Sequence, residues 1–257
     1  MTGRRPARTQ ESRALAERFR QGLVDVLGNR LKAAYLIGSI VFERTVLRTA
    51  DVDFYVVTHR ALGPRDKEAL GRMHRDLSRR FPPLQDLDGY YLSTAAAKST
   101  RRPQGLVFAP DGRVRPGRLN ETWALDRAHL WARAVVRIAG GDPRGIFRRP
   151  AWREIARELD REGVALRKDP ARHPTYSVLN LCRLMHTWAT RDPVTSKRAS
   201  GEWARTALPA DWRDLIDAAL RAYRGRDGPG DRRVLRTQVR PFFEFARPWI
   251  RAARKTG

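Results

Sequence analysis

The sequence is poor in cysteine, in acidic residues and in long apolar runs. A single cysteine, Cys182, occurs among the 257 residues, which excludes an internal disulfide, and its setting in "VLNLCRLM" predicts a buried helical residue. No stretch approaches the roughly 18 consecutive apolar residues of a membrane span. The start "MTGRRPARTQESR" is basic but has no apolar segment behind it, so we expect no signal peptide and a cytoplasmic protein with no membrane partner.

The shortage of acidic residues leaves the chain strongly cationic. Asp and Glu total 28 against 52 Lys and Arg, which gives a formal net charge of +24. Such a surface attracts polyanions through contacts to phosphate, so nucleic acid is a candidate partner. However, the basic residues are spread from "GRRPAR" to "RAARK" without one dominating cluster. An arginine-rich composition with charges on every helix, and no nucleic-acid partner, would produce the same distribution. Both interpretations stay open.

Hydrophobic residues make up 41% of the chain, enough for a core in one large domain or two small ones. Helical and strand patterns alternate at first, and from about residue 123 the periodicity is helical almost everywhere, interrupted by Gly and Pro. We therefore expect an α/β domain over residues 1–125 followed by an all-α domain over residues 126–257. The final segment "RVLRTQVRPFFEFARPWIRAARK" is basic and aromatic, and a packing helix is favoured over a membrane- or RNA-binding one.

Two expected strands carry aspartates in pairs. In "DVDFYVVT", Asp51 and Asp53 share one face of the sheet because strand side chains alternate. In "LQDLDGYYLS", Asp86 and Asp88 also share a face. If the two strands are neighbours in the sheet, one of these aspartates lies close to Asp51 and Asp53. Asp88 is the better candidate because the tyrosines that follow place it deeper in the strand. The alternative is an edge strand or turn with solvated aspartates.

Carboxylates this close repel each other unless a cation lies between them. A divalent metal is the economical solution, and hard oxygen ligands suit Mg²⁺. A two-metal site needs more oxygen ligands than the first pair supplies, which favours a contribution from the second strand. Zinc is not expected, because the histidines have no metal-ligand spacing with one another or with Cys182.

A Gly-Ser pair follows the strand that precedes the first aspartates. In "YLIGSIVF" the strand ends at Ile37, Gly38 lets the backbone approach closely, and Ser39 opens a short helix. Free N–H groups and a hydroxyl at such a turn can bind phosphate. A Gly-Ser pair alone commonly marks only a turn. It indicates a phosphate-binding site here because a strand with paired aspartates follows it.

The order of strand, Gly-Ser, helical turn and Asp-x-Asp strand resembles the nucleotidyltransferase superfamily that includes DNA polymerase beta. This resemblance implies a polymerase-beta-type domain with a mixed sheet. It implies that Gly38 and Ser39 bind the phosphates of ATP, and that Asp51 and Asp53 bind Mg²⁺. Asp88 would be the third carboxylate, which binds metal and takes the proton from the acceptor hydroxyl, although the family usually has glutamate there.

The helical half, residues 176–209, resembles the C-terminal domain of the streptomycin/spectinomycin adenylyltransferases. That domain has an arginine in the "LNLCRLM" helix, a lysine before an Ala-rich helix, and a Trp-Ala pair that closes it. Here these are Arg183, Lys197, and Trp203 with Ala204. The resemblance implies that Arg183 and Lys197 reach the triphosphate of ATP and that the protein confers antibiotic resistance. Without it, both would be surface charges of amphipathic helices.

The acceptor site is less well matched. The family binds its cationic drug with acidic and aromatic residues before the "SVLNLCRLM" helix, where this chain has Asp169 and, in place of an expected acid, His173. Glu121, Trp123 and Asp126 could supply an acidic and aromatic wall instead, although the same residues suit an ordinary helix start. We expect these positions to bind substrate.

Three functions remain open. The leading one is Mg²⁺-dependent transfer of AMP from ATP to a hydroxyl of an aminoglycoside-like small molecule, by a monomer. The second is the same chemistry on RNA such as a tRNA end, which the charge favours. The third is a non-catalytic nucleotide- or nucleic-acid-binding relative, permitted by Ala50 where the family commonly has serine and by Asp88 where it has glutamate.

Overall fold

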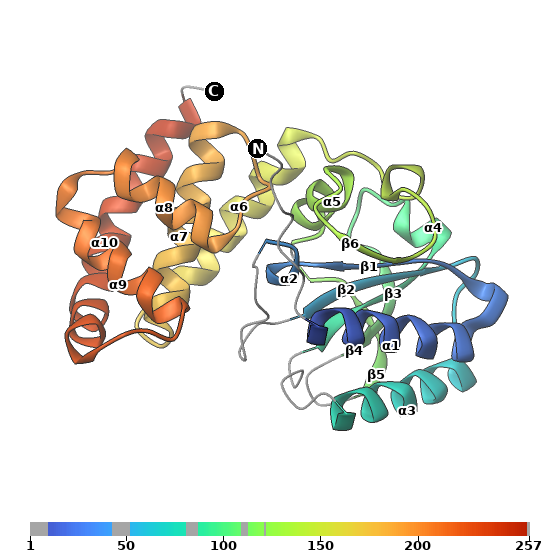
Figure 1. The fold of residues 1–257 in the computed structure, drawn as a ribbon. Helices are drawn as coiled ribbons and strands as arrows, with labels where there is room; N and C mark the ends of the chain where they lie inside the picture. Colours follow the sequence, from blue (N-terminus) through green and yellow to red (C-terminus); the bar gives the residue numbers. More distant parts are fainter. Residues whose placement is uncertain (1–9, 43–51, 81–86, 109–112, 121, 256–257) are drawn as a thin grey trace, which may run out of the picture. The chain divides into compact units, whose positions relative to one another are not determined.

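The computed structural model describes residues 10–42, 52–80, 87–108, 113–120 and 122–255. The chain forms two compact units, Met1–Ala151 and Trp152–Gly257, and each is described by itself. The first contains a mixed sheet and the second contains helices, which confirms the expected fold class (Figure 1). Within the described residues, no helix combines the length and the apolarity needed to cross a membrane.

A six-stranded sheet in the order β5-β4-β3-β2-β1-β6 organises the first unit (Figure 1). Its strands are β1 (Leu31–Ile37), β2 (Val52–Thr58), β3 (Leu87–Ser93), β4 (Gln104–Phe108), β5 (Val114–Arg118) and β6 (Val136–Ala139). Strands β2 and β3 are parallel, and the other neighbouring pairs are antiparallel. A crossover through helix α3 (Pro64–Arg80) joins β2 to β3, as a parallel pair requires.

Helices cover both faces of this sheet. Besides α3, they are α1 (Gln10–Leu27), α2 (Ser39–Phe42), α4 (Thr94–Ala97) and α5 (Trp123–Trp131), with 3₁₀ turns η1 (Gly28–Arg30) and η3 (Pro143–Gly145). Helices α1 and α3 lie side by side on one face (Figure 1). The apolar residues of α1 recur at helical spacing, and Leu15, Phe19 and Leu23 are buried there against the sheet.

Strand β2 is buried on both faces, which explains its continuous apolar run. Phe54 and Val56 pack in the core beneath α1 and α3. Tyr55 and Val57 pack in the core of the opposite face, which also contains Trp123 from α5. Because side chains alternate along a strand, Asp53 lies on the same face as Tyr55.

The second unit contains helices α6 (Trp152–Arg167), α7 (Pro174–Thr190), α8 (Lys197–Ala207), α9 (Arg213–Tyr223) and α10 (Pro229–Lys255), with the 3₁₀ turn η4 (Ala210–Trp212). Helix α7 packs against α8, α9 and α10 and is buried along most of its length. The sequence-based prediction for Cys182 is confirmed, since its side chain is fully buried in α7. Burial raises the pKa of this thiol to about 12, which makes it a packing residue.

The division between the units falls after Ala151, later in the chain than the boundary expected after residue 125. The reason is strand β6, in a segment whose periodicity suggested helix. β6 pairs with β1, so α5 and β6 belong to the sheet unit. A strand of four residues is too short for its period to be read reliably from the sequence.

Candidate functional site

Two aspartates lie side by side on adjacent strands of the sheet. Asp53 of β2 and Asp88 of β3 are direct partners in the parallel register, and both are partly buried. The antiparallel partner of Asp53 on its other side is Ile37, the last residue of β1. The sequence-based preference for Asp88 agrees with this register, while Asp51 and Asp86 lie outside the described residues.

The turn after β1 brings backbone against the Asp53 carboxylate. Gly38 has a φ of +77°, a left-handed conformation that favours glycine. A Cβ atom at this position would lie 2.5 Å from Oδ2 of Asp53. Ser39 then opens α2, and the N–H of Val41 donates to the Gly38 carbonyl over 3.1 Å. The structure thus places the predicted phosphate-binding turn and a predicted metal ligand in direct contact.

A pair of tyrosines forms the next row of the same face. Tyr55 and Tyr90 are partners in the register, and their rings stack with centroids 5.5 Å apart. The Tyr55 hydroxyl donates to Oδ2 of Asp126 over 2.7 Å. The backbone N–H of Asn120 donates to the Tyr90 hydroxyl over 3.1 Å. These bonds fix the two rings directly beneath the aspartates.

The aspartates and the tyrosines share one electrostatic environment. Burial raises the pKa of Tyr90 to about 12, and the negative charge of Asp88 acts in the same direction. Burial, followed by the charge of Asp126, raises the pKa of Tyr55 well above its usual value. Asp53 contributes to both shifts. Both hydroxyls therefore stay protonated at neutral pH, and the negative charge gathered here favours a bound cation.

The donor atoms present fit Mg²⁺. Asp53 and Asp88 offer carboxylate oxygens from neighbouring positions of two rigid strands, and magnesium is usually bound through one or two carboxylates together with substrate phosphates. Over the described ranges, no cluster of three or more His, Cys, Asp or Glu side chains forms a metal site. Asp51, predicted to bind the metal together with Asp53 and Asp88, is not among those residues.

The predicted acidic and aromatic wall is only partly present. Trp123 is 1% exposed, and its indole N–H donates to the carbonyl of Ser99 over 3.0 Å. Its ring packs against Tyr55 at 5.7 Å, so it supports the site from within the core and does not contact substrate as we expected. Glu121 lies outside the described residues. Asp126 faces the tyrosine pair.

Two predicted phosphate-binding cations lie on adjacent helices of the second unit. Lys197 is the first residue of α8, which Ser196 caps by accepting from the N–H of Ala199 over 2.9 Å. The ammonium of Lys197 lies 4.6 Å from the ring centroid of Tyr176 in the first turn of α7. Arg183 lies two turns farther along α7 and is partly buried.

The other two predicted substrate residues lie between α6 and α7. Asp169 and His173 are both exposed. The carbonyl of Asp169 accepts from the N–H of Arg172 over 3.4 Å, so its position is defined by backbone while its carboxylate is accessible. His173 directly precedes α7 and makes no side-chain capping bond.

The tyrosine pair, which was not among the predicted site residues, can be recognised from a pattern in the sequence. Each strand has the pattern Asp-x-Tyr, Asp53 to Tyr55 and Asp88 to Tyr90. Because strands repeat every two residues, an aspartate row in register implies a tyrosine row beneath it.

Comparisons with known proteins agree with this arrangement. Residues 152–247 match the family model of the aminoglycoside adenylyltransferase C-terminal domain. The crystal structure of spectinomycin adenyltransferase AAD(9) from Enterococcus faecialis with ATP and spectinomycin is similar to this chain, with a TM-score of 0.74 and 20% sequence identity. The similarity covers 91% of this chain and 99% of that one. No curated protein matches the chain significantly.

The two similarities cover different aspects of the molecule. The family model matches sequence in the helical unit, whereas the structural similarity extends over both units and concerns the fold. Together they agree with the predicted resemblance, which rested on a Gly-Ser and aspartate motif in one unit and a helical pattern in the other. The helical unit is thus similar to the C-terminal domain of the aminoglycoside adenylyltransferases, and the chain as a whole shares the fold of spectinomycin adenyltransferase AAD(9).

Proposed function

We propose that this protein transfers AMP from ATP to a hydroxyl group of an aminoglycoside-like small molecule in a Mg²⁺-dependent reaction, and so confers antibiotic resistance. The observation that carries the proposal is the pairing of Asp53 with Asp88 beside the left-handed turn at Gly38. The family match of the helical unit supports the activity. The similar crystal structure, which contains ATP and spectinomycin, supports the pair of substrates.

The reaction is a displacement at the α-phosphorus of ATP. The acceptor oxygen forms a bond to this phosphorus, the bond to the bridging oxygen of the β-phosphate breaks, and pyrophosphate leaves. Mg²⁺, held by Asp53 and Asp88, would supply positive charge to the reacting phosphate oxygens. Gly38 and Ser39 hold the phosphates through backbone N–H groups and a hydroxyl, and Arg183 and Lys197 bind the triphosphate.

The acceptor proton needs a base, and Asp88 is the proposed one. It lies next to Asp53 in the sheet and is partly buried, so its carboxylate is held by a rigid strand. Aspartate is one methylene shorter than glutamate, and transfer through one water molecule keeps the base within reach. Tyr90, protonated in the row beneath, keeps the floor of the site neutral.

The first test of this function is acceptor-dependent release of pyrophosphate. Purified protein is incubated with ATP, Mg²⁺ and either spectinomycin, streptomycin or no acceptor. We expect release with one of the drugs and only background without acceptor or with EDTA. Equal release with and without every acceptor would make the protein an ATP hydrolase and contradict the proposal.

Replacing Lys197 by alanine is expected to weaken ATP binding about 10- to 100-fold. The reason is the loss of one charge-assisted contact, worth roughly 1.5–3 kcal/mol. Calorimetric titration of ATP with Mg²⁺ measures the effect, and Lys255→Ala, an exposed lysine at the end of α10, is the matched control. Equal ATP affinity of the two variants would make Lys197 a solvated helix charge.

The acceptor class is tested by reversing one charge. Asp169 is exposed before α7, and a carboxylate here suits the ammonium groups of an aminoglycoside. We expect Asp169→Lys to raise the KM for the drug about tenfold while the affinity for ATP stays unchanged. Asp211→Lys, an equal charge change at an exposed position of η4, is the control. A similar KM for both variants would remove Asp169 from the drug site.

RNA is the second candidate acceptor, favoured by the net charge of +24. Binding through many arginines would weaken steeply with salt, because each neutralised phosphate releases counterions. We expect turnover on the drug to depend only weakly on salt between 50 and 200 mM. The Debye length is roughly 8 Å at physiological salt, so contacts within the binding site are screened much less than long-range repulsion. A steep salt dependence together with AMP transfer to tRNA would favour RNA.

A further inference from the structure

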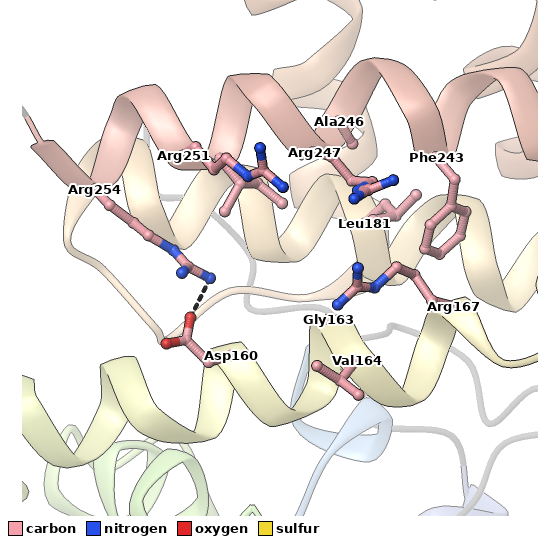
Figure 2. A pocket seen from close by; sticks show the side chains of 11 residues that line it. Asp160, Gly163, Val164, Arg167, Leu181, Phe243, Ala246, Arg247, Arg251 and Arg254 are labelled. Atoms are coloured by element: carbon pink, nitrogen blue, oxygen red, sulfur yellow. Dashed lines mark ion pairs between the residues drawn. The ribbon is translucent and has the colours of Figure 1, made fainter.

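A cationic groove lies within the second unit, between α6 and α10 and above α7. Its volume is about 280 Å³, close to the lower limit for pockets that hold small molecules. Figure 2 shows arginines entering it from both walls, Arg167 from α6 and Arg247, Arg251 and Arg254 from α10. None of these residues has a role in the proposed adenylyl transfer.

The three arginines of α10 form one row along the groove. Positions 247, 251 and 254 follow the spacing of i, i+4 and i+7, which places them on one face of the helix. This local concentration of charge is an exception to the dispersed pattern of basic residues in the sequence. The same spacing continues toward the start of α10 through Arg240, Arg236 and Arg233, which lie outside the groove.

Acidic residues compensate only part of this charge. Arg254 forms an ion pair with Asp160 across the groove (Figure 2). Arg247 pairs with Glu244, its neighbour on α10, at 3.1 Å. Arg167 and Arg251 form no ion pair with any residue that the structure describes. The guanidinium groups of Arg167 and Arg251, on opposite walls, are thus not neutralised by an acidic partner among the described residues.

The floor and one rim of the groove are apolar. Leu181 and Phe243 line it from below and are almost completely buried. Val164 on α6 is 50% exposed, one of few large hydrophobic side chains in the described chain that are open to solvent. Phe243 is only 4% exposed, so its ring offers no platform on which a base could stack. An occupant therefore needs an anionic group and a compact apolar body.

We propose that this groove binds a small amphipathic organic anion, with a phosphate or carboxylate held between Arg167 and Arg251 and an aromatic or aliphatic body against Val164. The planar guanidinium fork suits both anions because it donates two parallel hydrogen bonds. The small volume and the missing stacking surface disfavour a nucleic-acid strand, which needs an extended groove with exposed aromatic rings.

Calorimetric titration with phenyl phosphate tests the proposal, with inorganic phosphate and phenol as probes of the charge and of the apolar body alone. We expect saturable 1:1 binding of phenyl phosphate, and binding at least about tenfold weaker for either partial probe. Arg251→Gln should weaken phenyl phosphate binding about tenfold or more. Arg240→Gln, an exposed α10 arginine outside the groove, should leave it unchanged.

Three results would overturn this assignment. The first is equal affinity for inorganic phosphate and phenyl phosphate, because the apolar wall would then have no part. The second is equal binding by Arg251→Gln and Arg240→Gln, which would place the phenyl phosphate elsewhere, for instance at the ATP site. The third is a wild-type protein that does not bind phenyl phosphate but binds tRNA, with the tRNA binding weakened by Arg251→Gln. Thermal unfolding of both variants confirms that they are folded.

Discussion

Replacing Asp53 by asparagine lowers acceptor-dependent turnover about 100- to 1000-fold, and the protein stays folded. Asparagine keeps the size of the side chain but removes the charge that holds Mg²⁺, whose stabilisation of charge in the transition state is worth several kcal/mol. Folding does not need this charge, because its register partner is a second carboxylate, Asp88. The unfolding temperature is therefore expected to stay the same or to rise. Steady-state kinetics and thermal unfolding measure the two effects.

Asp25→Asn is the matched control for this variant. Asp25 lies on α1, on the other face of the sheet, is exposed and accepts a hydrogen bond from Gln21 over 2.8 Å. We expect it to retain full turnover. Wild-type turnover of Asp53→Asn at saturating Mg²⁺ would show that the aspartate row is not the metal site.

Replacing Gly38 by alanine is expected to lower turnover about 100-fold and to reduce the free energy of unfolding by about 1–3 kcal/mol. The left-handed φ of +77° strains any residue with a Cβ atom. The added methyl group would also lie 2.5 Å from the Asp53 carboxylate, so either the turn or the carboxylate must move. Turnover should therefore fall by more than the loss of stability explains.

Gly141→Ala separates this local effect from a general cost of replacing glycine. A Cβ atom at Gly141 meets nothing within 4 Å, and its φ is not in the left-handed region. Chemical denaturation and kinetics on both variants make the comparison. Full turnover of Gly38→Ala would mean that the β1–α2 turn does not position the phosphates.

The aspartate row was predictable because it depends on local patterns. The alternation in β2 and β3 determines the face of Asp53 and Asp88, and the helical pattern between the strands makes them parallel neighbours. The left-handed turn at Gly38 follows similarly from a glycine placed directly after a buried strand. In each case the necessary information lies in the strand itself or in the segment that directly follows it in the chain.

Features that depend on distant contacts were harder to predict. Strand β6 is defined by its pairing with β1, about 100 residues earlier in the chain, and this pairing moves the unit boundary to Ala151. Trp123 has the residue type of a substrate wall, but its ring packs in the core against Tyr55 and Phe147 instead. Residue type does not reveal which partner buries a side chain, and the burial of Trp123 is set by the tertiary packing.

Transfer of label from ATP carrying ³²P in its α-phosphate tests adenylyl transfer to a small molecule most directly. The protein is incubated with this ATP, Mg²⁺, spectinomycin, streptomycin and total tRNA in one mixture, and the labelled products are separated. We expect the label on one of the drugs, and its loss when Asp53→Asn replaces the wild-type protein. Label on tRNA, or no labelled product with any of the three acceptors, would contradict the proposed function.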